Sequence, residues 1–254
     1  MRSSWPSNLW IVRHGESAGN VARDLAHASG RGRIDIAERD VDVPLSRLGQ
    51  EQAQALGRWF ADLPAAERPE VVLTSPYLRA IHTAELIGEA GGLADRSPTR
   101  CIDERLRERE FGILDRLTTL GVKELHPEQA AMRASLGKFY HRPPGGESWC
   151  DVILRLRSML DTLSLHHAER RVLIVGHQVV VLCLRYLLEG LNEQQILEID
   201  AEGDVANCGV TQYRFEGGDG HDGSMRLERY NFTAPLERAG AHVTSAPDAI
   251  VAAR

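Results

Sequence analysis

Two histidines stand where apolar segments of this chain end, each beside a glycine. Residues 9–16 read Leu-Trp-Ile-Val-Arg-His-Gly-Glu, and residues 172–178 read Val-Leu-Ile-Val-Gly-His-Gln. Each apolar run predicts a short buried strand, and His14 and His177 come where the chain must turn. Ligands of open α/β sheets bind just outside the carboxyl ends of strands. If the two strands are neighbours in a parallel sheet, both imidazoles can reach one crevice.

Arg13 adds a guanidinium group to the same turn as His14. An arginine and a histidine delivered together suit an anion, phosphate most of all, because the planar guanidinium can hold two oxygens. These residues predict a binding site for a phosphate-like anion. The alternatives are a solvated turn at His14 and a buried, satisfied core histidine at His177.

The composition is that of an ordinary globular chain. Its 254 residues are 43% hydrophobic and 26% charged, and the formal net charge is −6. No overall basic field is present, so neither nucleic acid nor an anionic membrane is an expected partner. The four cysteines form no C-x-x-C pair, which argues against a zinc knuckle or a redox motif. No signal peptide or membrane-spanning run is recognisable, and we expect a cytoplasmic location.

The elements that must position these residues alternate between strands and helices. Ser46 predicts the cap of a helix that ends near Leu63, and a second strand follows at residues 71–74. Ser75 and Pro76 predict the start of the next helix. Further elements are a helix after the capping box of Ser148 and Asp151, a strand at 172–175, a helix at 179–188, and strands at 206–215 and 225–230. This order favours a three-layer α/β/α fold with a mostly parallel central sheet.

Two segments interrupt the alternation. Residues 17–43 are polar and irregular, and a loop of this length is typical of a functional lid or a mobile segment. Residues 103–146 hold a charged patch and short helical pieces, and we interpret them as an insertion that covers the active site. We expect a single domain over residues 1–234. Residues 235–254, rich in Ala, Pro, Ser and Thr, are expected to form a mobile tail.

A set of motifs in one order supports a specific resemblance. They are Arg13-His14-Gly15-Glu16-Ser17 with Asn20, Pro44-Leu45-Ser46 with Gly49, Ser75-Pro76-Tyr77-Leu78-Arg79-Ala80, Arg107-Glu108-Arg109, and Gly176-His177. Together they resemble the histidine phosphatase superfamily, also called phosphoglycerate mutase-like. The resemblance implies that His14 is the nucleophile and that it forms a phosphohistidine.

The resemblance also implies how the phosphoryl charge is held. Phosphoryl transfer depends mainly on positioning and on stabilising charge. Arg13, Arg79 and His177 would surround the phosphoryl oxygens, and Asn20 would add a neutral donor from the loop after the first strand. For Arg79 the alternative is an ordinary solvated residue of its helix.

An acid is needed to protonate the leaving oxygen. The resemblance gives this role to Glu108, because Leu-Arg-Glu-Arg-Glu-Phe-Gly at residues 106–112 matches the family best with Glu108 in the acid position. Glu104 and Glu110 are competing acids in the same segment. The alternative for all three is a solvated charge run.

Two further segments are similar to fructose-2,6-bisphosphatase domains, which favours the phosphatase branch. Residues 138–148 read Lys-Phe-Tyr-His-Arg-Pro-Pro-Gly-Gly-Glu-Ser, and Gln178 follows the second histidine. The resemblance suggests Lys138, Tyr140, Arg142 and Gln178 as substrate-binding residues. Polar surface residues on a loop are the alternative. The long loop at residues 21–43 departs from the family branches and argues against fructose 2,6-bisphosphate as the particular substrate.

The predicted function is therefore a phosphatase that hydrolyses phosphate monoesters through a phosphohistidine at His14. The other histidines show no pairing at metal-ligand spacing, so we expect no metal and no cofactor. The expected partner is a small phosphorylated substrate, and a homodimer is compatible with these features. One alternative is a cofactor-dependent phosphoglycerate mutase, which needs a larger and more basic cover over its site. A non-catalytic module that binds phosphorylated ligands is the other.

Overall fold

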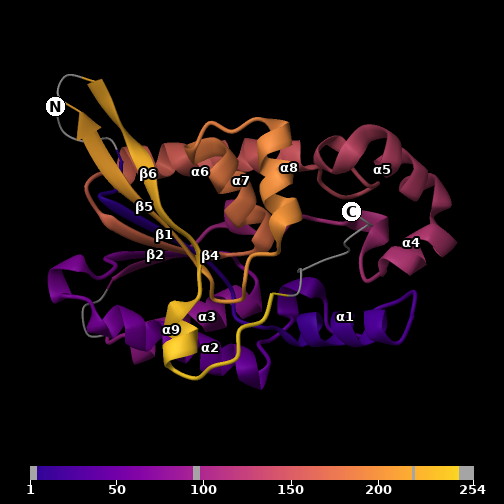
Figure 1. Cartoon of the computed structure of the whole chain (residues 1–254), viewed down its shortest axis with the longest axis horizontal. Coiled ribbons are helices and arrows are strands. Elements are labelled where there is room, and N and C mark those ends of the chain that lie inside the picture. Colours follow the sequence, from indigo (N-terminus) through magenta and orange to yellow (C-terminus); the bar gives the residue numbers. More distant parts are fainter. Residues whose placement is uncertain (1–4, 94–97, 219–220, 246–254) are drawn as a thin grey trace.

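A six-stranded sheet forms the centre of the molecule (Figure 1). The computed structural model describes residues 5–93, 98–218 and 221–245. In this part the strand order is β3-β2-β4-β1-β5-β6. The strands are β1 (Asn8–Arg13), β2 (Val71–Thr74), β3 (Thr99–Ile102), β4 (Arg171–Gly176), β5 (Val210–Gly218) and β6 (His221–Phe232). Strands β1 to β4 run parallel to one another. At one edge β5 pairs antiparallel with β1, and β6 pairs antiparallel with β5. The expected mostly parallel sheet is confirmed.

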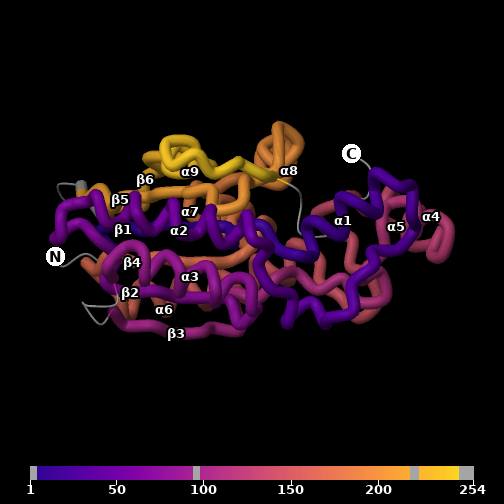
Figure 2. Tube along the Cα trace, turned by 90° about the horizontal axis from the view of Figure 1, so that it is seen from below, coloured from indigo at the N-terminus to yellow at the C-terminus, as the bar shows by residue number. Residues whose placement is uncertain are grey.

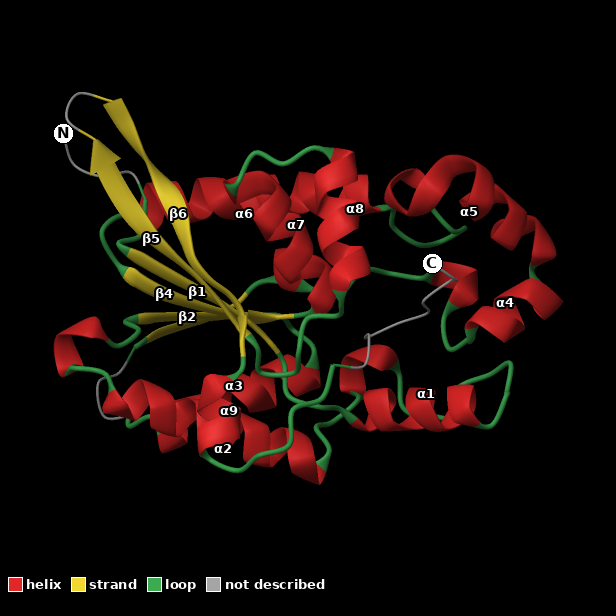
Figure 3. Cartoon of the chain, in the orientation of Figure 1, coloured by secondary structure: helices red, strands yellow, loops and turns green. Residues whose placement is uncertain are grey.

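Helices cover both faces of the sheet (Figure 3). The α-helices of the described residues are α1 (Ala18–Ala28), α2 (Arg47–Asp62), α3 (Leu78–Ala90), α4 (Thr119–Leu125), α5 (Pro127–Tyr140), α6 (Trp149–His166), α7 (Gln178–Leu188), α8 (Glu193–Glu202) and α9 (Ala234–Arg238). Helices α6 and α7 lie against one face, and α2, α3 and α9 lie against the other. The three-layer α/β/α architecture is confirmed.

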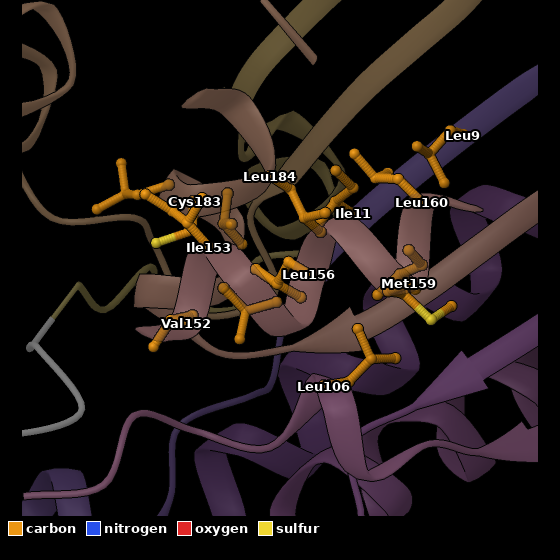
Figure 4. Close-up of a cluster of buried hydrophobic side chains, with 14 of the residues drawn as sticks. Leu9, Ile11, Leu106, Val152, Ile153, Leu156, Met159, Leu160, Cys183 and Leu184 are labelled. Atoms are coloured by element: carbon orange, nitrogen blue, oxygen red, sulfur yellow. The ribbon is translucent and has the colours of Figure 1, made fainter. Parts of the chain in front are cut away.

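Alternation along β1 explains why both faces are covered. Leu9 and Ile11 join a core with α6 and α7, which Figure 4 shows around Leu156. Trp10, by contrast, points into the second core with α2 and α3, where its ring meets Phe60 edge to face at 5.6 Å. Successive residues of a strand point to opposite faces, so a strand that is apolar throughout must be covered on both sides. The Leu-Trp-Ile-Val run therefore belongs in the middle of the sheet.

The register of the central strands brings the two histidines to one edge. Arg13 and Gly176 are paired as the last residues of β1 and β4, so His14 and His177 leave the sheet side by side. Strand β2 lies on the other side of β4, and Ser75 follows it at the same edge. The expectation that the two histidine-bearing strands are neighbours is confirmed.

The prediction of a long loop at residues 17–43 is wrong for its first part, because residues 18–28 form α1. Ser17 caps this helix, and the reciprocal contacts with Asn20 make a capping box. The buried face of α1 carries Asn20, Arg23 and Ala26 at helical spacing. Because two of these three residues are polar, the segment lacks the apolar stripe by which an amphipathic helix is recognised in a sequence.

The segment from residue 103 to 146 reaches beyond one end of the sheet, where its helices α4 and α5 lie near α1, as Figures 1 and 2 both show. It contains two 3-10 turns, followed by α4 and α5. A short bridge between Arg33 and Leu117 joins it to the chain that follows α1, and Thr118 donates from its backbone to Gly32 O at 3.0 Å. These two parts, far apart in sequence, therefore form one unit beside the carboxyl ends of the strands.

The described part of the predicted tail, residues 235–245, packs on α2. Leu236 of α9 is fully buried in the core that α2 and α3 share. Gln52 of α2 donates to Thr244 Oγ1 at 2.9 Å. Residues 246–254 lie outside the described part of the chain, as does the centre of the turn between β5 and β6.

Besides α1 and α9, strand β3 and helix α8 were not predicted. Strand β3 is exposed along its whole length, and in α8 only Ile196 is buried, so neither shows a strong apolar pattern. No helix of the described residues is both long enough and apolar enough to cross a membrane.

Candidate active site

The backbone of His14 is held where β1 ends. Its N–H donates to Gly176 O of β4 at 2.9 Å, and its carbonyl accepts from Asn207 Nδ2 at 3.0 Å. The imidazole is fully buried. The peptide units on both sides of the ring are therefore fixed by neighbouring strands and by the loop that precedes β5.

Two contacts determine the tautomer of His14. Nδ1 lies 2.6 Å from Gly15 O, and a carbonyl oxygen can only accept, so Nδ1 carries the proton. Nε2 lies 3.2 Å from Arg79 Nε, and a guanidinium nitrogen can only donate, so Nε2 offers its lone pair. Both contacts select the same neutral tautomer. The ring is thus held with a nucleophilic nitrogen facing a cation.

Only glycine fits at the turn after His14. A Cβ at Gly15 would lie 2.5 Å from Gly49 O, and a Cβ at Gly49 would lie 2.0 Å from Glu16 O. The Gly15 N–H donates to Thr83 Oγ1 at 3.0 Å. The turn is therefore pressed against the start of α2 and against α3, which explains why the motifs at residues 13–17 and 44–49 occur together.

His177 packs directly against His14. The ring centroids are 5.2 Å apart in an edge-to-face arrangement, and the ring of Tyr77 lies 5.1 Å from His177 on another side. His177 Nε2 lies 2.7 Å from Ser75 Oγ. Ser75 was expected to cap a helix, but α3 begins only at Leu78. The hydroxyl of Ser75 contacts the second histidine instead.

Glu108 is the acid that lies beside the histidines. Its Oε2 is 3.7 Å from His177 Nδ1, its Oε1 accepts from the Arg109 N–H at 2.7 Å, and only 1% of the residue is exposed. Glu104 and Glu110 are both exposed, and Glu110 accepts a hydrogen bond from Tyr77. Of the three acids that the sequence offers, the structure therefore brings one to the imidazoles.

Arg79 is buried in the site rather than solvated. Besides His14, its guanidinium contacts Asp40, with Nη1 donating to the backbone oxygen at 2.6 Å and to Oδ1 at 2.9 Å. The guanidinium also lies over the ring of Tyr77, 4.9 Å from the centroid. Neither Asp40 nor Tyr77 was singled out from the sequence. Tyr77 stood inside a recognised motif, which was the signal that could have found it.

Arg13 and Asn20 occupy different surroundings. The side chain of Arg13 is fully buried, and its Nη1 donates to Val205 O at 2.5 Å. Asn20 stands in the first turn of α1 rather than in a loop, and its Oδ1 accepts from the Ser17 N–H at 2.9 Å. Asn20 is thus placed by the same turn that caps α1.

The four residues suggested by the resemblance to fructose-2,6-bisphosphatase domains have partners outside the pair of histidines. Lys138 forms an ion pair with Asp200, Arg142 donates to Gly146 O, Gln178 donates to Asp204 Oδ1, and the ring of Tyr140 packs on Phe139. Tyr140 and Arg142 are also largely exposed. These contacts do not bring Lys138 or Arg142 to His14, and they give no support to a role of these two residues in binding substrate there.

A cavity lies next to Arg79, on the side of the unit formed by α1 and the segment after residue 103. Its lining includes Ser17, Ile36, Asp40, Phe111 and Asp115. Burial, and next the charge of Asp40, raises the pKa of the Asp115 carboxyl above its ordinary value. Acidic and basic side chains therefore line this cavity together, since Arg23 and Arg116 lie there beside Arg79, Asp40 and Asp115.

The described residues form no metal-binding cluster. In the described residues, no three or more His, Cys, Asp and Glu side chains are grouped so that they could hold a metal ion. The four cysteines are all unpaired thiols.

Comparison with known proteins identifies related chains. A family model described as "Histidine phosphatase superfamily (branch 1)" matches residues 9–231. The chicken 6-phosphofructo-2-kinase/fructose-2,6-bisphosphatase is 30% identical over 190 residues, which cover 74% of this chain. These residues cover 34% of the chicken protein, so this chain matches about a third of that relative's length.

Two further similarities cover more of the related protein. A probable phosphoglycerate mutase, GpmB, from Yersinia enterocolitica is 30% identical over 185 residues, covering 72% of this chain and 75% of that protein. The structure of a mycobacterial glucosyl-3-phosphoglycerate phosphatase in complex with inorganic phosphate superposes with a TM-score of 0.65 at 25% identity. It covers 90% of this chain and 99% of the mycobacterial chain.

Proposed function

This chain belongs to the histidine phosphatase superfamily (branch 1), and from that premise we propose that it hydrolyses phosphate monoesters without a metal, through a phosphohistidine at His14. One observation carries the proposal. His14 is held as the neutral tautomer whose lone pair is on Nε2, because Nδ1 donates to Gly15 O and Nε2 accepts from Arg79. A neutral imidazole whose lone pair faces a buried cation can act as the nucleophile toward a phosphoryl group held by that cation.

In the first step, His14 Nε2 attacks phosphorus and the bond from phosphorus to the alcohol oxygen breaks. The carboxyl group of Glu108 gives its proton to that oxygen, so the alcohol leaves uncharged. In the second step, Glu108 takes a proton from a water molecule that attacks the phosphohistidine. The phosphorus–nitrogen bond then breaks, and inorganic phosphate leaves with His14 and Glu108 in their starting forms.

Arg13, Arg79 and His177 hold the phosphoryl oxygens in this proposal. Preorganised donors aimed at developing charge are worth most where water is excluded, and all three side chains are almost completely buried. Arg79 already contacts the nucleophilic nitrogen, so it is in reach of a phosphoryl group bound there. Asn20 is the proposed neutral donor from the start of α1.

The proposed substrate is a small molecule with one phosphate ester, in the cytoplasm. Unpaired thiols suit a reducing compartment. Lys138 is paired with Asp200 and Arg142 donates to Gly146 O, so these two residues do not favour a bisphosphate. The names of the relatives point to phosphorylated sugars and phosphoglycerates as the first compounds to examine.

A phosphate-release screen tests this function. The purified chain is incubated with sugar phosphates, phosphoglycerates, nucleotides and an aryl phosphate, with and without a chelator. We expect phosphate release that the chelator leaves unchanged, and a fall of at least about 10³-fold in His14→Ala. His27→Ala, on the exposed end of α1, is the matched control and keeps full activity. Strong inhibition by the chelator contradicts the proposal.

A phosphoglycerate mutase is the second candidate, because the Yersinia relative carries that name. A mutase would interconvert 2- and 3-phosphoglycerate faster than it releases phosphate, and would depend on priming by the bisphosphate. A coupled isomerisation assay beside the phosphate-release assay separates the two. Tight binding of a phosphate ester with no product after long incubation would indicate a binding module instead.

A further inference from the structure

Asp40 holds the same guanidinium group that the proposed function assigns to phosphate. Arg79 Nη1 donates to Asp40 O and Oδ1, and Nη2 lies 3.4 Å from Asp40 Oδ2. The third nitrogen, Nε, faces His14 Nε2. The carboxylate thus meets the two-pronged side of the guanidinium, which is also the side that binds two phosphate oxygens.

The two partners differ in their freedom to separate. The side chain of Arg79 is 3% exposed, whereas that of Asp40 is 45% exposed. Asp40 opens a short 3-10 turn, Asp40–Asp42, in which no residue is buried. Asp40 therefore sits at the mouth of the site and can withdraw into solvent, while Arg79 remains fixed beside the nucleophile.

A phosphoryl group on His14 and the Asp40 carboxylate compete for one cation. Nε of Arg79 is 3.2 Å from His14 Nε2, so the oxygens of a group bound to that nitrogen reach the guanidinium. They also come close to the negative charge of Asp40, and like charges repel strongly where water is partly excluded. Resting on the proposed function, we infer that Asp40 is a positioning residue that neutralises Arg79 in the empty site and weakens the binding of inorganic phosphate, so that product leaves readily.

The negative charge of Asp40 also disfavours negative charge on its neighbours. Asp115 lines the same cavity, and Tyr77 lies under the guanidinium. After burial, the charge of Asp40 is the largest cause that raises the pKa of each of these two groups. An anion that enters beside Arg79 meets the same repulsion.

The substitution Asp40→Asn removes the charge and keeps the anchor. The backbone oxygen of Asp40, which accepts from Arg79 Nη1, remains, and the amide oxygen can accept in place of Oδ1. Binding of inorganic phosphate is measured by titration calorimetry near pH 7. We expect phosphate to bind about tenfold more tightly to Asp40→Asn. Removing one nearby negative charge changes the affinity for an anion by about this factor.

Two further variants make the result specific. Asp42→Asn changes an acid in the same turn that pairs with the exposed Arg39, and we expect it to bind phosphate like the wild type. Asp40→Glu keeps the charge, and we expect it to remain within about threefold of the wild type. With an ester substrate, Asp40→Asn should lower KM, and kcat should fall if phosphate release limits turnover.

Direct binding separates this inference from the proposed activity. Phosphate affinity in Asp40→Asn that is equal to or weaker than in the wild type overturns the inference, because Asp40 would then serve only to anchor Arg79. Equal tightening in Asp42→Asn overturns it as well. Tighter phosphate binding without hydrolysis of any ester would keep the role of Asp40 and refute the proposed function.

Discussion

His177 and Ser75 are 102 residues apart in sequence, and Nε2 of the one lies 2.7 Å from Oγ of the other. Both are fully buried, and both follow parallel strands, β4 and β2, that are neighbours in the sheet. Glu108 faces the other ring nitrogen, Nδ1, at 3.7 Å. The second imidazole is thus oriented from both sides by residues of different segments.

We expect Ser75→Ala to lower kcat by about tenfold to a hundredfold with a smaller change in KM. The reason is that His177 loses a partner that orients its ring, and misplaced catalytic groups cost rate rather than ground-state binding. Steady-state kinetics on the best substrate of the screen provides the measurement. Ser7→Ala, at an exposed hydrogen bond to Arg170 O, is the control. An equal loss in both variants would speak against a role through His177.

Glu108→Gln tests the proton donor. A sugar or alkyl phosphate needs a proton on its leaving oxygen, whereas a nitrophenyl phosphate leaves as a stable phenolate. We therefore expect Glu108→Gln to lower kcat/KM by about 10²–10⁴-fold for the alkyl ester and far less for the aryl ester. The exposed Glu104→Gln is the matched control. A uniform loss for both esters would remove Glu108 from the acid role.

Arg142→Ala tests whether the exposed basic residue after α5 contacts substrate. Its guanidinium donates to Gly146 O and pairs with Asp151, and its side chain is 68% exposed, so we expect kcat/KM for monoesters to stay within about threefold of the wild type. Parallel assays with a monophosphate and a bisphosphate of the same sugar provide the measurement. A rise of tenfold or more in KM for the bisphosphate alone would restore Arg142 as a substrate-binding residue.

Glu147 is expected to stabilise the fold above acidic pH. Its carboxylate accepts from Arg155 Nε and Nη2, both at 3.0 Å, and from Arg107 at 2.6 Å. Burial alone would raise the pKa of Glu147, but the hydrogen bonds and charge of Arg155, together with the Glu110 N–H and the charge of Arg107, outweigh it, and the pKa is lowered. The stabilisation is therefore complete above the pKa of an unfolded glutamate and is lost as pH falls through the lower, folded value.

Glu147→Gln should consequently reduce the free energy of unfolding by about 2–3 kcal/mol at pH 7. The difference from the wild type should shrink below about pH 4, where the unfolded glutamate is protonated. Urea unfolding at several pH values measures both. Glu51→Gln, in an exposed helical pair with Arg47, should change stability by less than about 0.5 kcal/mol. A pH-independent difference for Glu147→Gln would contradict the electrostatic explanation.

The strands that carry the histidines could be predicted because their signals are local. An apolar run followed by a glycine and a polar residue marks the end of a buried strand whatever surrounds it. The same holds for the caps at Ser46 and Ser148, which the structure confirms. Helix α1 was missed because its buried face is polar, and its burial depends on segments distant in sequence.

The sequence by itself determined the α/β class, the two histidine-bearing strands and the resemblance to a phosphatase superfamily, since each depends on short motifs that can be recognised one by one. It also favoured Glu108 as the acid. Only the tertiary structure decided that Glu108 lies against His177, that Ser75 contacts a histidine rather than a helix end, and that Asp40 covers Arg79. These are contacts between segments that lie far apart in the chain. Strand order and packing bring these segments together, and no local sequence pattern encodes the strand order or the packing.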